Sequence, residues 1–216
     1  MNPEQAIVRT RLEIEKNPNL KIVAISGPGE PLANPETFET LEMIRREYED
    51  IEICMSTNGT LLRDNVVWLK KLKVKTITVS MSTVYPTTAV KIYEWARLGD
   101  HVFYDEEMGS MIVKSQLEGI SRASSEGIYV KVNSILIPDI NMHDIIPLSK
   151  AISEAGASLQ NIVPLVPYDK LASFRPPTSI ELNGIREMAS GFIKQFYRCK
   201  QCRSDVVGIP GSDRIL

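Results

Sequence analysis

Cysteine is scarce in this chain: its 216 residues contain three, Cys54, Cys199 and Cys202. An odd number of cysteines excludes a fully paired disulfide framework of the kind that stabilises small secreted domains. The first residues, MNPEQAIVRTRLEIEKNP, are charged throughout and do not resemble a secretory signal. These features predict a reducing compartment, and we expect a cytoplasmic protein.

Long hydrophobic runs and a strong net charge are also lacking. No apolar stretch is long enough to span a bilayer. The formal net charge is −2, so the composition indicates neither a membrane nor a nucleic-acid partner. Hydrophobic residues make up 43% of the chain, which is enough for a sizeable core and predicts one folded α/β unit.

The sequence alternates between patterns typical of helices and of strands. Short apolar strands rich in β-branched residues are predicted at residues 20–26, 51–56, 75–82, 129–137 and 159–167, with helices between them. Two of the predicted helices cover residues 87–98 and 178–197, and residues 99–110 look irregular. This alternation predicts βαβ crossovers and a parallel sheet, which carries its chemistry at the carboxyl ends of the strands.

The loop GPGEP follows the first predicted strand. Glycine lets the backbone approach a ligand closely, because it has no Cβ, and Glu30 could accept hydrogen bonds from an ammonium group. The alternative is a plain loop that caps the next helix. STNG follows the second strand, where the Asn58-Gly59 pair favours a left-handed turn. Cys54, near the end of that strand, is either a metal or cluster ligand or a small core residue.

The remaining two cysteines form a C-x-x-C pair in the basic stretch YRCKQCRSD. Thiolates at this spacing can hold one metal ion or one cluster, and basic neighbours favour the thiolate form. The alternatives are a strained local disulfide or two thiols without a role. The spacing alone does not decide between them, because no second pair accompanies it.

Taken in order, five stretches resemble the radical S-adenosylmethionine enzymes, and within them the NifB-type nitrogenase cofactor maturases. The stretches are AISGPGEPLANPETFETL, ICMSTNGTLL, TVSMSTVYPTTAVKIYEWA, VKVNSILIPDIN with NIVPLVP, and FYRCKQCRSDVVG. The resemblance extends over nearly the whole chain. It implies a partial (β/α)6 barrel whose first strand is missing, formed by residues 1–197, and a cluster-binding tail formed by residues 198–216.

The resemblance also implies cofactors and ligands. S-adenosylmethionine would lie across the strand ends, and Cys54, Cys199 and Cys202 would hold two [4Fe–4S] precursor clusters, which are fused around a carbide derived from the methyl group of S-adenosylmethionine. Thiolates are the usual protein ligands of such clusters. The implied partners are iron–sulfur cluster donors and nitrogenase assembly or carrier proteins. No catalytic residue is identified. The residues expected to contact S-adenosylmethionine are Gly27, Pro28, Gly29, Glu30, Asn58, Ser80, Asn133, Ile162, Pro164 and Leu165.

The sequence departs from the family in one respect. The C-x-x-x-C-x-x-C motif that holds the radical-generating cluster is absent. The chain could be a truncation, could be completed by a second chain that supplies this segment, or could serve as a non-catalytic iron–sulfur scaffold. We favour a truncated or split enzyme, because the later strand ends look intact. A zinc protein that uses the three cysteines and a histidine is a further alternative.

Overall fold

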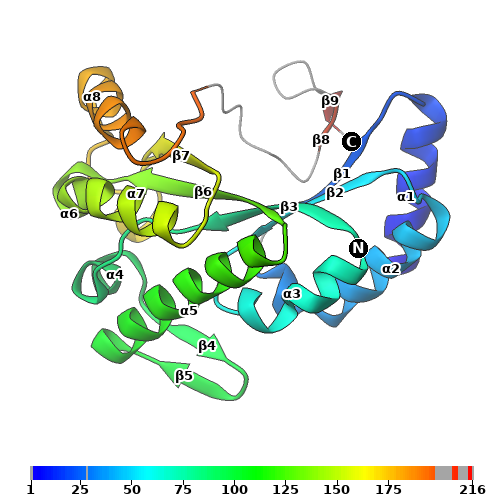
Figure 1. Cartoon of the computed structure of the whole chain (residues 1–216), viewed down its shortest axis with the longest axis horizontal. Helices are drawn as coiled ribbons and strands as arrows, with labels where there is room; N and C mark the ends of the chain where they lie inside the picture. The colour runs from blue at the N-terminus through cyan, green and yellow to red at the C-terminus, as the bar shows by residue number, and fades with distance from the viewer. Residues whose placement is uncertain (1, 28, 198–205, 209–213, 216) are drawn as a thin grey trace.

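The computed structural model describes residues 2–27, 29–197, 206–208 and 214–215. A five-stranded sheet runs through its centre in the order β1-β2-β3-β6-β7, and all neighbouring strands are parallel (Figure 1). These strands lie where the sequence predicts them, and they confirm the α/β class with an incomplete barrel. Their bounds are β1 (Ile22–Ile25), β2 (Glu52–Thr57), β3 (Val74–Ser80), β6 (Tyr129–Leu136) and β7 (Leu159–Pro164).

Helices connect the strands, and several begin at clear sequence signals. Asn2 and Gln5 form a capping box at the start of the first helix, as do Thr178 and Glu181 at the start of the last. In Figure 1 these two helices, α1 and α8, lie at opposite ends of the molecule. Within the described residues, no helix is both long and apolar enough to cross a membrane. The longer helices are α1 (Pro3–Lys16), α2 (Pro35–Glu47), α3 (Leu62–Lys71), α4 (Pro86–Ile92), α5 (Asp105–Ser125), α7 (Ile145–Glu154) and α8 (Ser179–Ser190), and the short ones are η1 (Pro31–Ala33), α6 (Pro138–Asn141), η2 (Met142–Asp144) and η3 (Asp169–Leu171).

The two faces of the sheet differ in chemistry, because side chains alternate along each strand. One face is apolar and fully buried, as at Met55, Ile77 and Val132. The residues of the other face are paired by the parallel register, in which Cys54 lies opposite Thr76 and Ser80 opposite Asn133. We call this second surface the polar face. It is defined by Cys54, Ser56, Thr76, Thr78, Ser80, Lys131, Asn133 and Asn161.

A register shift at the start of β3 sets the alternation of that strand. Ile53 pairs with Val74, but the next residue of β2, Cys54, pairs with Thr76. Lys75 is therefore an extra residue in β3, as in a β-bulge. Val74 and Ile77 are both buried although three positions separate them. The bulge lets both apolar side chains reach the core while Thr76 and Thr78 stay on the polar face.

The structure corrects two predicted helices. The predicted helix at residues 87–98 ends at Ile92, because β4 (Ala96–Leu98) pairs with β5 (His101–Phe103) in an antiparallel hairpin. Gly99, with φ of +60°, forms part of its two-residue turn. In Figure 1 the hairpin projects at the lower edge of the molecule, beside α5.

The predicted helix at residues 178–197 ends at Ser190. Beyond it, the N–H of Phe196 donates to the carbonyl of Gln160 at 2.8 Å, and the N–H of Gln160 donates to the carbonyl of Lys194 at 2.9 Å. Gln195 thus forms a parallel bridge with Gln160. This segment occupies the position of a further strand beside β7.

Candidate functional site

The loop after β1 is fastened to the end of β2 through Glu30. The carboxylate accepts hydrogen bonds from the hydroxyl of Thr57 at 2.6 Å, the N–H of Asn58 at 2.6 Å and the N–H of Leu32 at 3.1 Å. Nearby, the hydroxyl oxygen of Ser26 is buried and has no hydrogen-bond partner among the described residues. The carboxyl end of β1 therefore presents a fixed carboxylate beside an unsatisfied hydroxyl group. Gly27 and Gly29 lie in this loop and are exposed.

The end of β2 is held close to the end of β3 by Gln116 of α5. Its side-chain amide donates to the carbonyls of Asn58 and Ser80, both at 2.8 Å. Gly59 has φ of +84°, as the Asn-Gly pair predicts. A Cβ at Gly59 would lie 2.8 Å from Val79 and 3.1 Å from Gln116, so the turn can approach β3 this closely only with glycine.

Three side chains form a row across β3, β6 and β7, level with the carboxyl end of β3. Ser80 lies opposite Asn133, and Asn133 lies opposite Asn161. The side-chain amide of Asn161 donates to the side-chain oxygen of Asn133 at 2.9 Å. Asn161 is 0% exposed. Its side-chain oxygen is buried and has no hydrogen-bond partner among the described residues. An unsatisfied buried oxygen is costly, and it indicates a missing donor.

The second half of β7 and the residue after it contribute mainly backbone. Ile162 is fully buried, and its register with Ser134 places its side chain on the helix-covered face. Its carbonyl accepts two hydrogen bonds from Arg186, at 3.1 and 2.6 Å. Leu165 is buried, while Pro164 is exposed at the rim.

The loops after β3 and β6 are joined by a buried amide. The side chain of Asn141 donates to the carbonyls of Ser82 and Ile135, both at 2.8 Å, and accepts from the N–H of Ile137 at 2.8 Å. Asn141 is 0% exposed. These bonds make the rim of the sheet a connected structure and not a set of independent loops.

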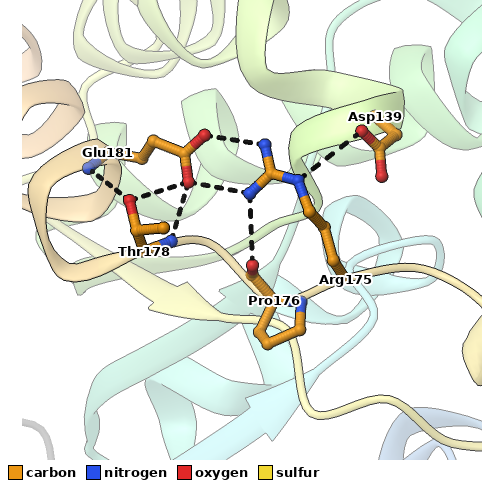
Figure 2. Close-up of polar contacts among 5 residues, drawn as sticks. All are labelled: Asp139, Arg175, Pro176, Thr178 and Glu181. Carbon is orange, nitrogen blue, oxygen red and sulfur yellow. Dashed lines mark hydrogen bonds and ion pairs between the residues drawn. The ribbon is translucent and has the colours of Figure 1, made fainter.

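An ion-pair cluster fixes the loop between β7 and α8 (Figure 2). Arg175 donates two hydrogen bonds to Glu181, at 2.9 and 2.7 Å, and lies 3.9 Å from the carboxylate of Asp139 at the start of α6. Glu181 also accepts from the N–H and the hydroxyl of Thr178, at 2.7 and 2.9 Å. The hydrogen bonds from Arg175 and Thr178 lower the pKa of Glu181 to about 2. We call Asp139, Arg175, Thr178 and Glu181 the rim latch.

The structure describes one of the three cysteines. Cys54 is half-buried on the polar face, opposite Ala24 of β1 and Thr76 of β3. Cys199, Cys202 and Pro28 lie outside the described residues. Among the residues that the structure describes, no three histidine, cysteine, aspartate or glutamate side chains come together as a metal site.

Three residues of this site, Lys131, Asn161 and Gln116, are not among those that the sequence predicts. Lys131 and Asn133 alternate with valines in YVKVNS, so strand alternation could have placed Lys131 on the polar face. Asn161 could have been placed in the same way from its position in LQNIVP. Gln116 lies within a helix and contacts two loops, and no local pattern indicates those contacts.

Comparison with known proteins agrees with this arrangement. The model of the Radical SAM superfamily matches residues 2–152. A FeMo cofactor biosynthesis protein NifB from Methanocaldococcus jannaschii is 38% identical over 216 residues, which cover 100% of this chain and 72% of the relative. A protein of the same name from Klebsiella pneumoniae is 37% identical over 221 residues, covering 99% of this chain and 47% of the relative.

A solved structure shares the fold at low sequence identity. The radical SAM methyltransferase from Sphaerobacter thermophilus matches with a TM-score of 0.65 and 17% identity, covering 91% of this chain and 56% of that protein. At this identity the likeness concerns the fold alone.

Proposed function

The chain belongs to the radical SAM superfamily and, within it, to the NifB family, and we propose that it works in the biosynthesis of the nitrogenase iron–molybdenum cofactor. The observation that carries this proposal is the 38% identity to a cofactor biosynthesis protein along the whole chain. The proposed task is that of a maturase, which fuses two [4Fe–4S] units and inserts a carbide. The polar face and the carboxyl ends of its strands are the proposed site.

The residues at the strand ends suit S-adenosylmethionine. Glu30 accepts three hydrogen bonds, and a carboxylate has about four acceptor positions, so it can also accept from the methionine ammonium group. Ser26 and Asn161 hold buried unsatisfied oxygens at opposite edges of the sheet. A ligand stretched across the strand ends, with a donor near each end, would satisfy both. When bound, S-adenosylmethionine supplies the radical chemistry and the methyl group of the reaction.

The other expected contacts fit this arrangement to different degrees. Asn58 follows β2, Ser80 ends β3 and Asn133 lies opposite Ser80 on β6, where a ribose could reach them. Ile162 would contribute little, because its side chain faces the helices and its carbonyl is bonded to Arg186. Pro164 and Leu165 remain the proposed contacts at the β7 rim, with the rim latch holding the loop that follows them.

The precursor clusters are substrates of this reaction, and Cys54 is proposed to bind one of them through its position on the polar face. Cys199 and Cys202 are proposed to bind the other. The residues of this chain do not fit the radical-generating cluster, because the sequence has no C-x-x-x-C-x-x-C motif. No step through that cluster is therefore assigned to them, and we propose that a further segment supplies it, either on a longer form of this chain or on a separate chain.

A genetic experiment tests the proposed function. The chain is expressed, together with a separate segment that carries the C-x-x-x-C-x-x-C motif, in a nitrogen-fixing bacterium whose own maturase gene has been removed, and nitrogenase activity is measured by acetylene reduction. We expect the chain to restore activity and Cys54→Ser to abolish it, while Ser121→Ala, an exposed change on α5, has no effect. A folded chain that takes up iron but restores no activity would contradict the proposal.

A binding experiment separates the maturase from the scaffold. S-adenosylmethionine binding is measured by calorimetry on the parent chain, Glu30→Gln and the exposed control Glu39→Gln. We expect Glu30→Gln to weaken binding about tenfold, because a hydrogen bond to a charged group contributes roughly 1.5 to 3 kcal/mol, and Glu39→Gln to bind as the parent does. A parent chain that takes up iron and does not bind S-adenosylmethionine would favour the non-catalytic scaffold.

A further inference from the structure

Lys131 is a half-buried cation in the middle of the polar face. It lies on β6, opposite Thr78 of β3 and Leu159 of β7. Its ammonium nitrogen lies 5.4 Å from the centre of the Phe196 ring. In the part of the chain that the structure describes, no carboxylate lies within 4 Å of this nitrogen and no hydrogen bond to it is present. Among the described residues, this positive charge therefore has no negative partner.

The described neighbours of Lys131 do not compensate its positive charge. A half-buried ammonium group is costly unless an anion or hydrogen-bond acceptors compensate it. The aromatic face of Phe196 attracts a cation but does not neutralise it. On the outer surface, by contrast, many lysines pair with carboxylates, as Lys70 does with Glu126. An anionic ligand on the polar face would supply the missing partner.

The positions of the thiols indicate which anion this is. Cys54 lies on the same face, and β3 alone separates its strand from β6. Adjacent strands lie about 4.8 Å apart, so the two backbones are about 10 Å apart, a gap that a cluster and a lysine side chain can bridge. Phe196, which the ammonium group contacts, precedes Cys199 by three positions in the sequence. The sulfide and thiolate sulfurs of a [4Fe–4S] cluster carry its negative charge and accept hydrogen bonds, so they can pair with an ammonium group whatever the net charge of the whole cluster.

The methionine carboxylate of S-adenosylmethionine is the other anion to consider. The proposed ammonium site at Glu30 lies beside β1 and β2, and the sheet order places β6 three strands away from β1. The unsatisfied oxygen of Asn161 lies one row nearer the rim than Lys131 and needs a donor, not an anion. The methionine end therefore belongs at the β1 edge of the sheet, three strands away from Lys131, and the cluster is the better match.

We infer that Lys131 binds the sulfur atoms of an iron–sulfur substrate on the polar face, between Cys54 and Phe196. This inference rests on the proposed function, because it assumes that the thiols bind precursor clusters. The ammonium group positions the cluster by donating hydrogen bonds to its sulfurs. Lys131 is thus a positioning residue for the substrate.

The experiment compares Lys131→Met, which removes the charge at similar length, with Lys131→Arg, which keeps it. Lys150→Met, an exposed change on α7, is the control. After anaerobic reconstitution with iron and sulfide, we measure the iron retained against a chelator and the reduction potential of the bound cluster. We expect Lys131→Met to retain iron about tenfold less tightly and to shift the potential to a more negative value, because the reduced cluster carries more negative charge. Lys131→Arg and Lys150→Met should match the parent.

Folding is checked by thermal unfolding of each variant without iron. If Lys131→Met does not fold, Lys131→Gln takes its place. Unchanged iron retention and potential in the charge-removed variant would overturn the inference, as would weaker binding of S-adenosylmethionine with unchanged iron retention, which would assign Lys131 to the methionine carboxylate. A parent chain that takes up no iron would instead count against the proposed function.

Discussion

At the scale of single residues, the rim of the sheet depends on a few charged groups with well-defined partners. Glu181 caps α8 and receives two hydrogen bonds from Arg175, which also lies beside Asp139. One carboxylate thus connects the start of a helix to the loop after β7 and to the loop after β6. The rim latch is mostly exposed to solvent, so its contribution depends on geometry and on pH.

The rim latch should weaken in acid. The pKa of Glu181 is about 2 in the fold and about 4.3 in an unfolded chain. Its stabilising contribution is therefore fully present above about pH 4.3 and is lost as the pH falls towards 2. We expect Glu181→Gln to lower the melting temperature at pH 7, and this difference to shrink at pH 2.5. Glu187→Gln on the same helix is the control and should change little at either pH. A difference that does not depend on pH would contradict this assignment.

Strand alternation allows some of the site to be predicted from the sequence and leaves other parts hidden. Cys54, Ser80 and Asn133 follow from it directly, because each lies on a strand whose apolar residues identify the buried face. The bonds from Arg186 to the carbonyl of Ile162 could not be predicted. They join residues 24 positions apart through a packing arrangement that no local pattern encodes.

At the scale of elements, the contact between α4 and α5 depends on Gly109. A Cβ at this position would lie 2.3 Å from the carbonyl oxygen of Pro86, so the two helices can approach this closely only with glycine. Gly184 in α8 offers a contrast, because no atom of the described residues lies within 4 Å of a Cβ there.

Alanine at these two glycines should have opposite effects. Gly109→Ala forces backbone atoms apart, and overpacking of this kind costs about 1 to 3 kcal/mol. Gly184→Ala should stabilise the protein by up to about 1 kcal/mol, because alanine favours the helix more than glycine does. The free energies of unfolding from urea titrations measure both effects. Equal destabilisation by the two substitutions would show that helix packing at Gly109 is not the cause.

Element boundaries show where local patterns fail. Ile185, Ala189 and Ile193 are spaced by four residues and are all buried, so the helical pattern continues past the true end of α8 at Ser190. The later residues instead pair with β7. Pairing with β7 determines the conformation of this segment. The spacing of its hydrophobic residues alone is compatible with either a helix or an extended strand.

At the scale of the whole molecule, the strands differ in how well the fold protects them. β3 and β6 have paired strands on both sides, and residues such as Ile77 and Val132 are fully buried. β1 is four residues long and pairs with β2 alone in the described sheet, and Ile22 and Ala24 are exposed. The order of strands was not evident from the sequence alone, but the number and direction of the sheet strands were.

Amide hydrogen exchange should follow this order. We expect the slowest exchange in β3 and β6, where opening requires much of the sheet to unfold, and faster exchange in β1. Mass spectrometry of exchanged peptides measures both in one experiment. Protection of residues 22–25 equal to that of residues 76–80 would contradict the expected order.

Because Lys75 is an extra residue in β3, Val74 and Ile77 both face the core although three positions separate them. A deletion of that single residue would make Val74 and Thr76 neighbours, and the ordinary alternation of a strand would then keep Val74 and Ile77 in the core and Thr76 on the polar face. One residue gained or lost after Thr76 would instead turn the remainder of β3 over, so that Thr78 would enter the core. A relative can therefore lack the residue at position 75 and keep the same chemical surface, whereas a change of length further along β3 would abolish it.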